Sequence, residues 1–143
     1  MSMESEERVK YKVKKKLGID RKRLFSSFKF AGQGILQAYR GEQNLRIHTF
    51  MAILVIIFGV FLKISYFEWI ACLLLIALVL MAEFFNTAIE YVVDLASPKV
   101  HPLAKAAKDV ASAGVLMMAI ISAIVGLIIF VPKLIDFMGG YLW

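Results

Sequence analysis

Four polar side chains interrupt an apolar part of the sequence at helical spacing. Glu83, Asn86, Glu90 and Asp94 follow 14 uncharged residues, and on a helix each would project within about 60° of Glu83. Carboxylates on an apolar helix usually face a bundle interior, a cavity or a metal ion, so this stripe is a candidate for function. The alternative is that the helix has already left the membrane and that the acids, Asp94 above all, are solvated.

Two further positions carry charges that could complete a site. Glu42 lies at a junction between expected helices; if it meets Glu90 across a helix contact, the pair offers hard oxygen ligands suited to Mg²⁺ with phosphates. Helix capping is the alternative role. Lys108 and Asp109 begin an apolar run, where they could contact a phosphate and a base or ribose, or merely anchor the helix at the interface. His48 stands beside apolar residues and is expected to be structural.

Composition points to the membrane. Of the 143 residues 60% are hydrophobic and the mean hydropathy is +0.73, whereas soluble domains contain ~45–50% apolar residues. Twelve of the 17 Lys and Arg residues precede His48, which predicts a cytoplasmic surface facing anionic lipid. A soluble nucleic-acid-binding module would not carry so apolar a remainder. The single cysteine, Cys72, offers no disulfide or metal motif.

A surface helix and an arm are expected before the first apolar segment. Residues 1–19 are basic and have no sustained apolar face. This composition predicts a flexible arm. Asp20 could then cap a helix over residues 20–40 whose apolar residues share one face. We expect this amphipathic helix to lie in the membrane interface, the alternative being a soluble helix packed on a partner.

Three apolar segments are long enough to cross a hydrocarbon core of ~30 Å. The connection after the second segment carries lysines and falls on the same side of the membrane as the basic amino terminus. The amino terminus should therefore be cytoplasmic and the carboxyl terminus outside. The predicted fold is therefore an all-α integral membrane protein with a single membrane domain, residues 20–143. The predicted spans are residues 47–66, 67–95 and 110–132.

The motifs on these segments form a recognisable set. In the second and third spans they are Glu83-x-x-Asn86-x-Ala88-Ile89-Glu90 and, 18 residues later, Lys108-Asp109-x-x-Ser112-Ala113. Nearer the amino terminus they are Glu42-x-Asn44-x-Arg46-Ile47-His48 and Ser27-Phe28-Lys29-Phe30-Ala31-x-x-Gly34-Ile35. The first set resembles the prokaryotic diacylglycerol kinase family, and the second its Gram-positive branch, which includes undecaprenol kinases. The resemblance covers roughly residues 23–130.

The resemblance implies a homotrimer of three-span subunits whose active sites are shared between neighbours at the membrane surface. It implies that Glu42 and Glu90 hold Mg²⁺ on the ATP phosphates and that Glu83 is the catalytic base, with Asn86 beside it. The nucleotide contacts that it implies are Lys108 to phosphate, Asp109 to adenosine, and Arg23, Phe30 and Ala31 on the surface helix.

Three departures leave these assignments in place. Gly41 stands where enteric members have asparagine, Gly114 stands where alanine is more usual, and the arm before Asp20 is longer than the family needs.

The expected activity is therefore transfer of the ATP γ-phosphate to a membrane lipid hydroxyl in the bacterial cytoplasmic membrane, with the branch favouring undecaprenol over diacylglycerol. The alternative from the residues alone is a small oligomeric transporter or proton-conducting protein that uses the aligned acids as a relay. That alternative requires polar groups through the whole membrane depth, and the third span offers only Ser112 and Ser122.

Overall fold

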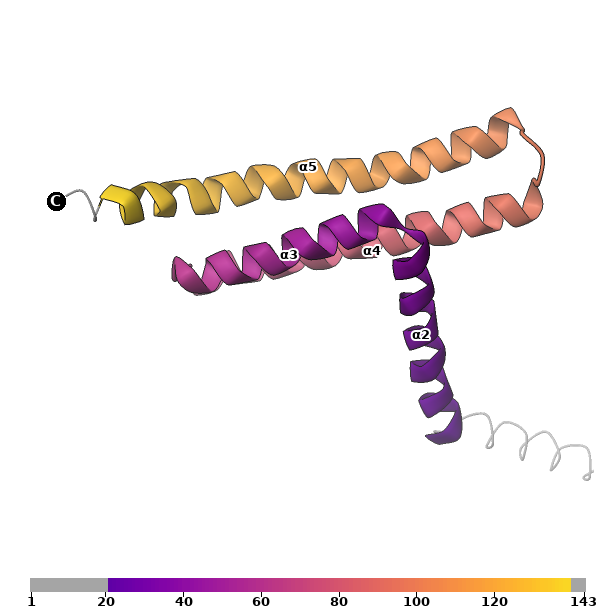
Figure 1. Ribbon diagram of the computed structural model, residues 1–143, viewed down its shortest axis with the longest axis horizontal. Helices are drawn as coiled ribbons and strands as arrows, with labels where there is room; N and C mark the ends of the chain where they lie inside the picture. The colour runs from indigo at the N-terminus through magenta and orange to yellow at the C-terminus, as the bar shows by residue number, and fades with distance from the viewer. Residues whose placement is uncertain (1–20, 140–143) are drawn as a thin grey trace, which may run out of the picture. The chain divides into compact units, whose positions relative to one another are not determined.

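The computed structural model describes residues 21–139, and every regular element within them is an α-helix. This confirms the predicted all-α class. The residues up to Gln37 form one compact unit and those from Ala38 onward another, so each unit is described by itself. The arm and Asp20 lie outside the described residues. The helices are α2 (Arg21–Gly41), α3 (Gln43–Phe61), α4 (Tyr66–Ala96) and α5 (Pro102–Gly139) (Figure 1).

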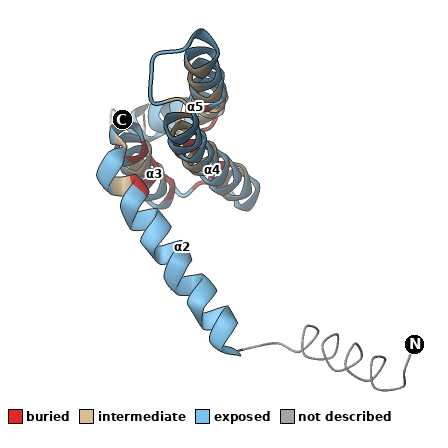
Figure 2. Ribbon diagram, turned by 90° about the vertical axis from the view of Figure 1, so that its right-hand side faces the viewer, coloured by how far each residue is buried: buried red, intermediate tan, exposed pale blue. Residues whose placement is uncertain are grey.

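The helices α3, α4 and α5 are long and apolar enough to cross a membrane. Their most apolar windows have mean hydropathies of 1.9, 2.2 and 2.8. Much of the ribbon of these helices is coloured as exposed (Figure 2). The exposed residues include many large apolar ones on all three helices, among them Phe50, Leu74 and Leu127. Exposing so much apolar surface to water costs free energy, whereas contact of the same surface with lipid acyl chains does not. These helices fit a small multi-pass membrane protein.

The turn between α3 and α4 occupies residues 62–65, because α3 ends at Phe61 and α4 begins at Tyr66. Lys63 adopts a left-handed backbone (φ 52°), and the Ile64 amide donates to the Gly59 carbonyl at 3.1 Å, which closes a Schellman motif. Ser65 then caps α4 in a capping box with Glu68. These local stop and start signals, rather than hydropathy, set the turn.

The third apolar helix is longer than predicted at both ends. Pro102 occupies its first position, where the missing N–H costs nothing, and the Leu103 amide donates to His101 Nδ1 at 3.2 Å. At the other end α5 continues through Pro132 to Gly139, so the helix extends beyond the predicted apolar span of residues 110–132. A proline removes one backbone hydrogen bond, and transmembrane helices tolerate this more readily than soluble ones.

The three helices pack with α4 against both α3 and α5 (Figure 1). A buried cluster of Ile64, Cys72 and Ile129 lies near the α3–α4 turn, with Trp69 packed against it. At the same end Lys133 Nζ lies 3.3 Å from Glu68 Oε2, which ties α5 to the start of α4. The described part of the bundle therefore has an apolar cluster at the turn, whereas its buried polar residues lie farther along α4.

Gly59→Ala is expected to lower the free energy of unfolding by about 1–3 kcal/mol, because a β-carbon there would overpack the turn. It would lie 2.9 Å from Trp69 Cη2 and 3.1 Å from Ile64 Cδ1. Thermal unfolding of the detergent-purified protein measures the effect. Gly114→Ala is the matched control, since its β-carbon would meet nothing within 4 Å. Equal stability of the two variants would contradict this account of the turn.

Candidate active site

The polar stripe of α4 is buried rather than solvated at its centre. Glu83 is 1% exposed, Thr87 3% and Asn86 6%, whereas Asp94 is exposed. The Thr87 hydroxyl donates to the Glu83 backbone carbonyl at 3.0 Å, and Asn86 Nδ2 donates to Glu90 Oε1 at 2.9 Å. Burial of a carboxylate and a primary amide one helical turn apart is unfavourable unless they are used or paired. The solvated alternative therefore holds for Asp94 but not for Glu83.

Glu42 is at the N-cap position of α3, but its side chain makes no capping hydrogen bond. The junction is held by other groups: Tyr39 Oη lies 2.6 Å from Thr49 Oγ1, and Arg46 Nη1 donates to the Tyr39 carbonyl at 2.9 Å. On the α4 side, a β-carbon on Gly41 would lie 3.3 Å from the Tyr91 hydroxyl. The junction thus packs closely on α4 and leaves the Glu42 carboxylate for another purpose.

Electrostatic interactions within one chain link the charges that the sequence predicts to converge. Glu83 lies within electrostatic reach of Glu42 and Glu90, and Lys108 lies within reach of Glu90. Three carboxylates contributed by the α3 junction and α4 are therefore gathered beside the start of α5. Their individual roles stay predictions.

His48 also belongs to this cluster, although the sequence predicts only a structural role for it. Its Nε2 lies 3.2 Å from Glu83 Oε1, within ion-pair distance. The contact is not aligned as a hydrogen bond, and Glu83 Oε1 has no hydrogen-bond partner within residues 21–139. A signal was present in the sequence: His48 stands three residues after Leu45 and four before Ala52, and both of these are buried on α3.

Lys108 and Asp109 are each paired with another side chain. Lys108 Nζ contacts Asp94 Oδ1 at 2.6 Å, which links α5 to the end of α4. Asp109 Oδ2 accepts from Lys105 Nζ at 2.5 Å within α5. A phosphate that binds Lys108 would therefore have to share the ammonium group with Asp94 or displace Asp94 from it. The assignment of Lys108 and Asp109 to a nucleotide stays a prediction.

The donor set fits Mg²⁺ held jointly with phosphates. No group of three or more His, Cys, Asp or Glu side chains in residues 21–139 could hold a metal by itself. Mg²⁺ is commonly bound by one or two carboxylates together with substrate phosphates and water. Glu42 and Glu90 are therefore ligands of a suitable type and number. Asn86 Oδ1 is a further buried oxygen without a hydrogen-bond partner in the described part of the chain. A cation would also offset the gathered negative charge.

The remaining predicted nucleotide contacts, Arg23, Phe30 and Ala31, lie on α2 and are all exposed. They belong to the other compact unit, so their assignment stays a prediction. The Ser27 hydroxyl donates to the Arg23 carbonyl at 3.0 Å, a contact within the helix.

Nothing in α5 favours a proton relay. The Ser122 hydroxyl donates to the Met118 carbonyl at 2.8 Å, and the Ser112 hydroxyl donates to the Asp109 carbonyl at 3.2 Å. Both hydroxyls are thus engaged with the backbone of their own helix. The transporter alternative therefore gains no support from α5.

The chain is similar to several known proteins of one family. The family model described as prokaryotic diacylglycerol kinase matches residues 29–130. An undecaprenol kinase of Bacillus subtilis (strain 168) is 48% identical over 112 residues, covering 78% of this chain and 91% of that protein. A diacylglycerol kinase of Synechocystis is 39% identical over 116 residues (80% and 66%). The diacylglycerol kinase of Escherichia coli (strain K12) is 28% identical over 102 residues (71% and 84%).

Proposed function

Because the chain belongs to the prokaryotic diacylglycerol kinase family, we propose that it transfers the γ-phosphate of ATP to the hydroxyl of undecaprenol, with Mg²⁺ as cofactor. Membership makes the chain a lipid kinase, a phosphotransferase that acts on an alcohol. The observation that supports the finer proposal is the buried Glu83 carboxylate, which lies within electrostatic reach of Glu42 and Glu90.

The depth of Glu83 in the membrane suits a reaction at the inner leaflet. A helix rises about 1.5 Å per residue, so roughly 20 residues cross a hydrocarbon core ~30 Å thick. Counted from Phe67 near the start of α4, the crossing ends at about Asn86. Glu83 would then lie just inside the boundary at which lipid hydroxyls sit, while Lys108 would face the phosphates on the aqueous side.

In the proposed reaction Glu83 accepts the proton of the lipid hydroxyl while the hydroxyl oxygen bonds to the γ-phosphorus of ATP. ADP leaves with the electrons of the broken P–O bond. Lys108 offsets charge on the transferred phosphoryl group, and Asn86 holds Glu90 in place through its 2.9 Å hydrogen bond. Glu42 and Glu90 would hold Mg²⁺, which when bound would neutralise charge on the phosphates. Most of the rate enhancement would come from positioning and electrostatics.

The proposal includes the cellular setting that the sequence predicts. The protein lies in the bacterial cytoplasmic membrane with its amino terminus inside, and the basic amino-terminal region faces anionic lipid. Its α2 lies in the interface as an amphipathic helix that presents Arg23, Phe30 and Ala31 to the nucleotide. Three copies form a homotrimer with shared active sites, and chemical cross-linking of the purified protein measures this state.

The purified protein, assayed with Mg-ATP and either undecaprenol or diacylglycerol in matched detergent micelles, tests the proposed function. We expect phosphorylation of both lipids to be measurable and kcat/KM to be higher for undecaprenol. A higher kcat/KM for diacylglycerol would overturn the substrate assignment alone. Absence of phosphate transfer to either lipid would overturn the proposed function.

A further inference from the structure

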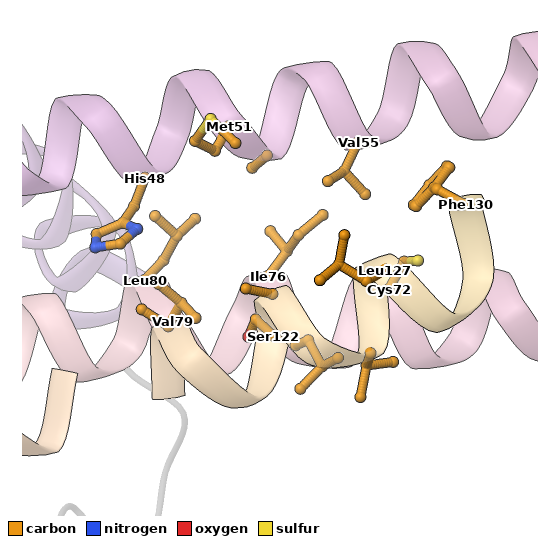
Figure 3. A pocket seen from close by; sticks show the side chains of 16 residues that line it. His48, Met51, Val55, Cys72, Ile76, Val79, Leu80, Ser122, Leu127 and Phe130 are labelled. Carbon is orange, nitrogen blue, oxygen red and sulfur yellow. The ribbon is translucent and has the colours of Figure 1, made fainter. Parts of the chain in front are cut away.

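A cavity of about 500 Å³ lies between α3, α4 and α5, and His48 stands at one end of it (Figure 3). Aliphatic and aromatic side chains such as Met51, Ile76 and Phe130 make up most of the lining. Ser122 also lines the cavity, but its hydroxyl is engaged by the Met118 carbonyl. The imidazole is therefore a polar group at the end of an otherwise apolar space.

His48 also contacts the carboxylate that the proposed mechanism uses as a base. Nε2 of His48 lies 3.2 Å from Glu83 Oε1, and the two residues are 24% and 1% exposed. Two unprotonated atoms at this distance would repel each other through their lone pairs, so a proton must be shared between them. Among the described residues no other side chain forms a hydrogen bond or ion pair with the Glu83 carboxylate: Arg46 donates to Tyr39, and Lys108 is paired with Asp94.

Apolar packing does not account for a histidine at this position. An aliphatic side chain on the buried face of α3 would line the cavity equally well, but it would leave Glu83 Oε1 buried without any polar neighbour. An unpartnered buried acceptor costs free energy, more so when it is charged. The same imidazole touches the cavity and the carboxylate, so it stands where a hydroxyl entering from the cavity would approach Glu83.

We propose that His48 is a positioning residue for the proposed base: its Nε2–H donates to Glu83 Oε1 and orients the carboxylate so that the second oxygen meets the lipid hydroxyl. A base held by a third group is a common arrangement in enzymes that activate a hydroxyl. The misalignment of the contact is consistent with this role, because catalytic hydrogen bonds often tighten only when substrate is bound. This inference rests on the proposed lipid kinase activity.

His48→Leu and His48→Gln separate this role from packing. Leu keeps the apolar volume but has no donor, whereas Gln offers an N–H of similar reach. We expect His48→Leu to lower kcat by about 10–100-fold, with KM and Kd for ATP changed less than twofold, and His48→Gln to recover most of the loss. His101→Leu makes the same substitution at an exposed histidine outside the site and should keep wild-type kcat.

The measurements are kcat and KM with Mg-ATP and undecaprenol in micelles, ATP binding by calorimetry, and thermal unfolding of each variant. Wild-type kcat in His48→Leu, or equal loss in both His48 variants, would overturn the inference while the proposed function stands. Loss of ATP binding or of folding in both variants would also overturn it, since it would indicate a structural role. An inactive wild-type protein would remove the proposed function and the inference together.

Discussion

Glu83→Gln is expected to reduce kcat for lipid phosphorylation by at least about a hundredfold, the contribution typical of a general base. Glutamine has nearly the same shape and fills the same buried position, but its amide cannot accept the hydroxyl proton. Because Glu83 is not assigned to ATP or Mg²⁺, the Kd for Mg-ATP should change little. Steady-state kinetics in micelles and calorimetric ATP titration measure the two effects separately.

Glu68→Gln is the matched control for this variant. It lies on the same helix, near the opposite end, where its carboxylate accepts from the Ser65 amide and contacts Lys133. Losing these contacts should lower the unfolding temperature, but kcat should stay within about twofold of wild type, because the group is remote from the stripe. Full activity of Glu83→Gln would remove Glu83 as the base, and a large loss of kcat in Glu68→Gln would show that the assay reports α4 stability instead.

Lys108→Met is expected to lower kcat/KM for ATP by about 10²–10³-fold, as removal of one strong transition-state contact does. Methionine keeps most of the side-chain length but has no charge to set against the phosphoryl oxygens. Lys108 is only one-third exposed and already points toward acidic groups on α4, so its ammonium group is held near the carboxylate cluster before ATP binds. Initial rates over a range of ATP concentrations measure the change.

Two comparisons decide what the loss in Lys108→Met means. Lys99→Met removes an exposed positive charge from the α4–α5 connection and should leave kcat/KM within about twofold, which excludes a general effect of net charge. Asp94→Asn removes the partner of Lys108 in the resting protein. If Lys108 only anchors α5 to α4, Asp94→Asn will reproduce the loss, and the phosphate assignment will be wrong.

Several helix boundaries could have been read more closely from the sequence. Ser65 and Glu68 have the spacing of a capping box, and this signal places the start of α4 more sharply than the hydropathy does. At Pro132 the apolar run that defines the predicted span ends, whereas α5 continues to Gly139. Local signals at helix ends compete with one another, and a single sequence does not state which will dominate.

The sequence by itself determined the three apolar helices, because an apolar run of this length must satisfy its backbone hydrogen bonds internally in a bilayer. It also determined the stripe of Glu83, Asn86 and Glu90, because the rotation per residue of a helix is constant. Only the tertiary structure decided that His48 meets Glu83 and that Lys108 meets Asp94. Those contacts depend on how α3 and α5 are rotated and shifted against α4, and that packing arises between helices whose separate sequence periods do not specify it.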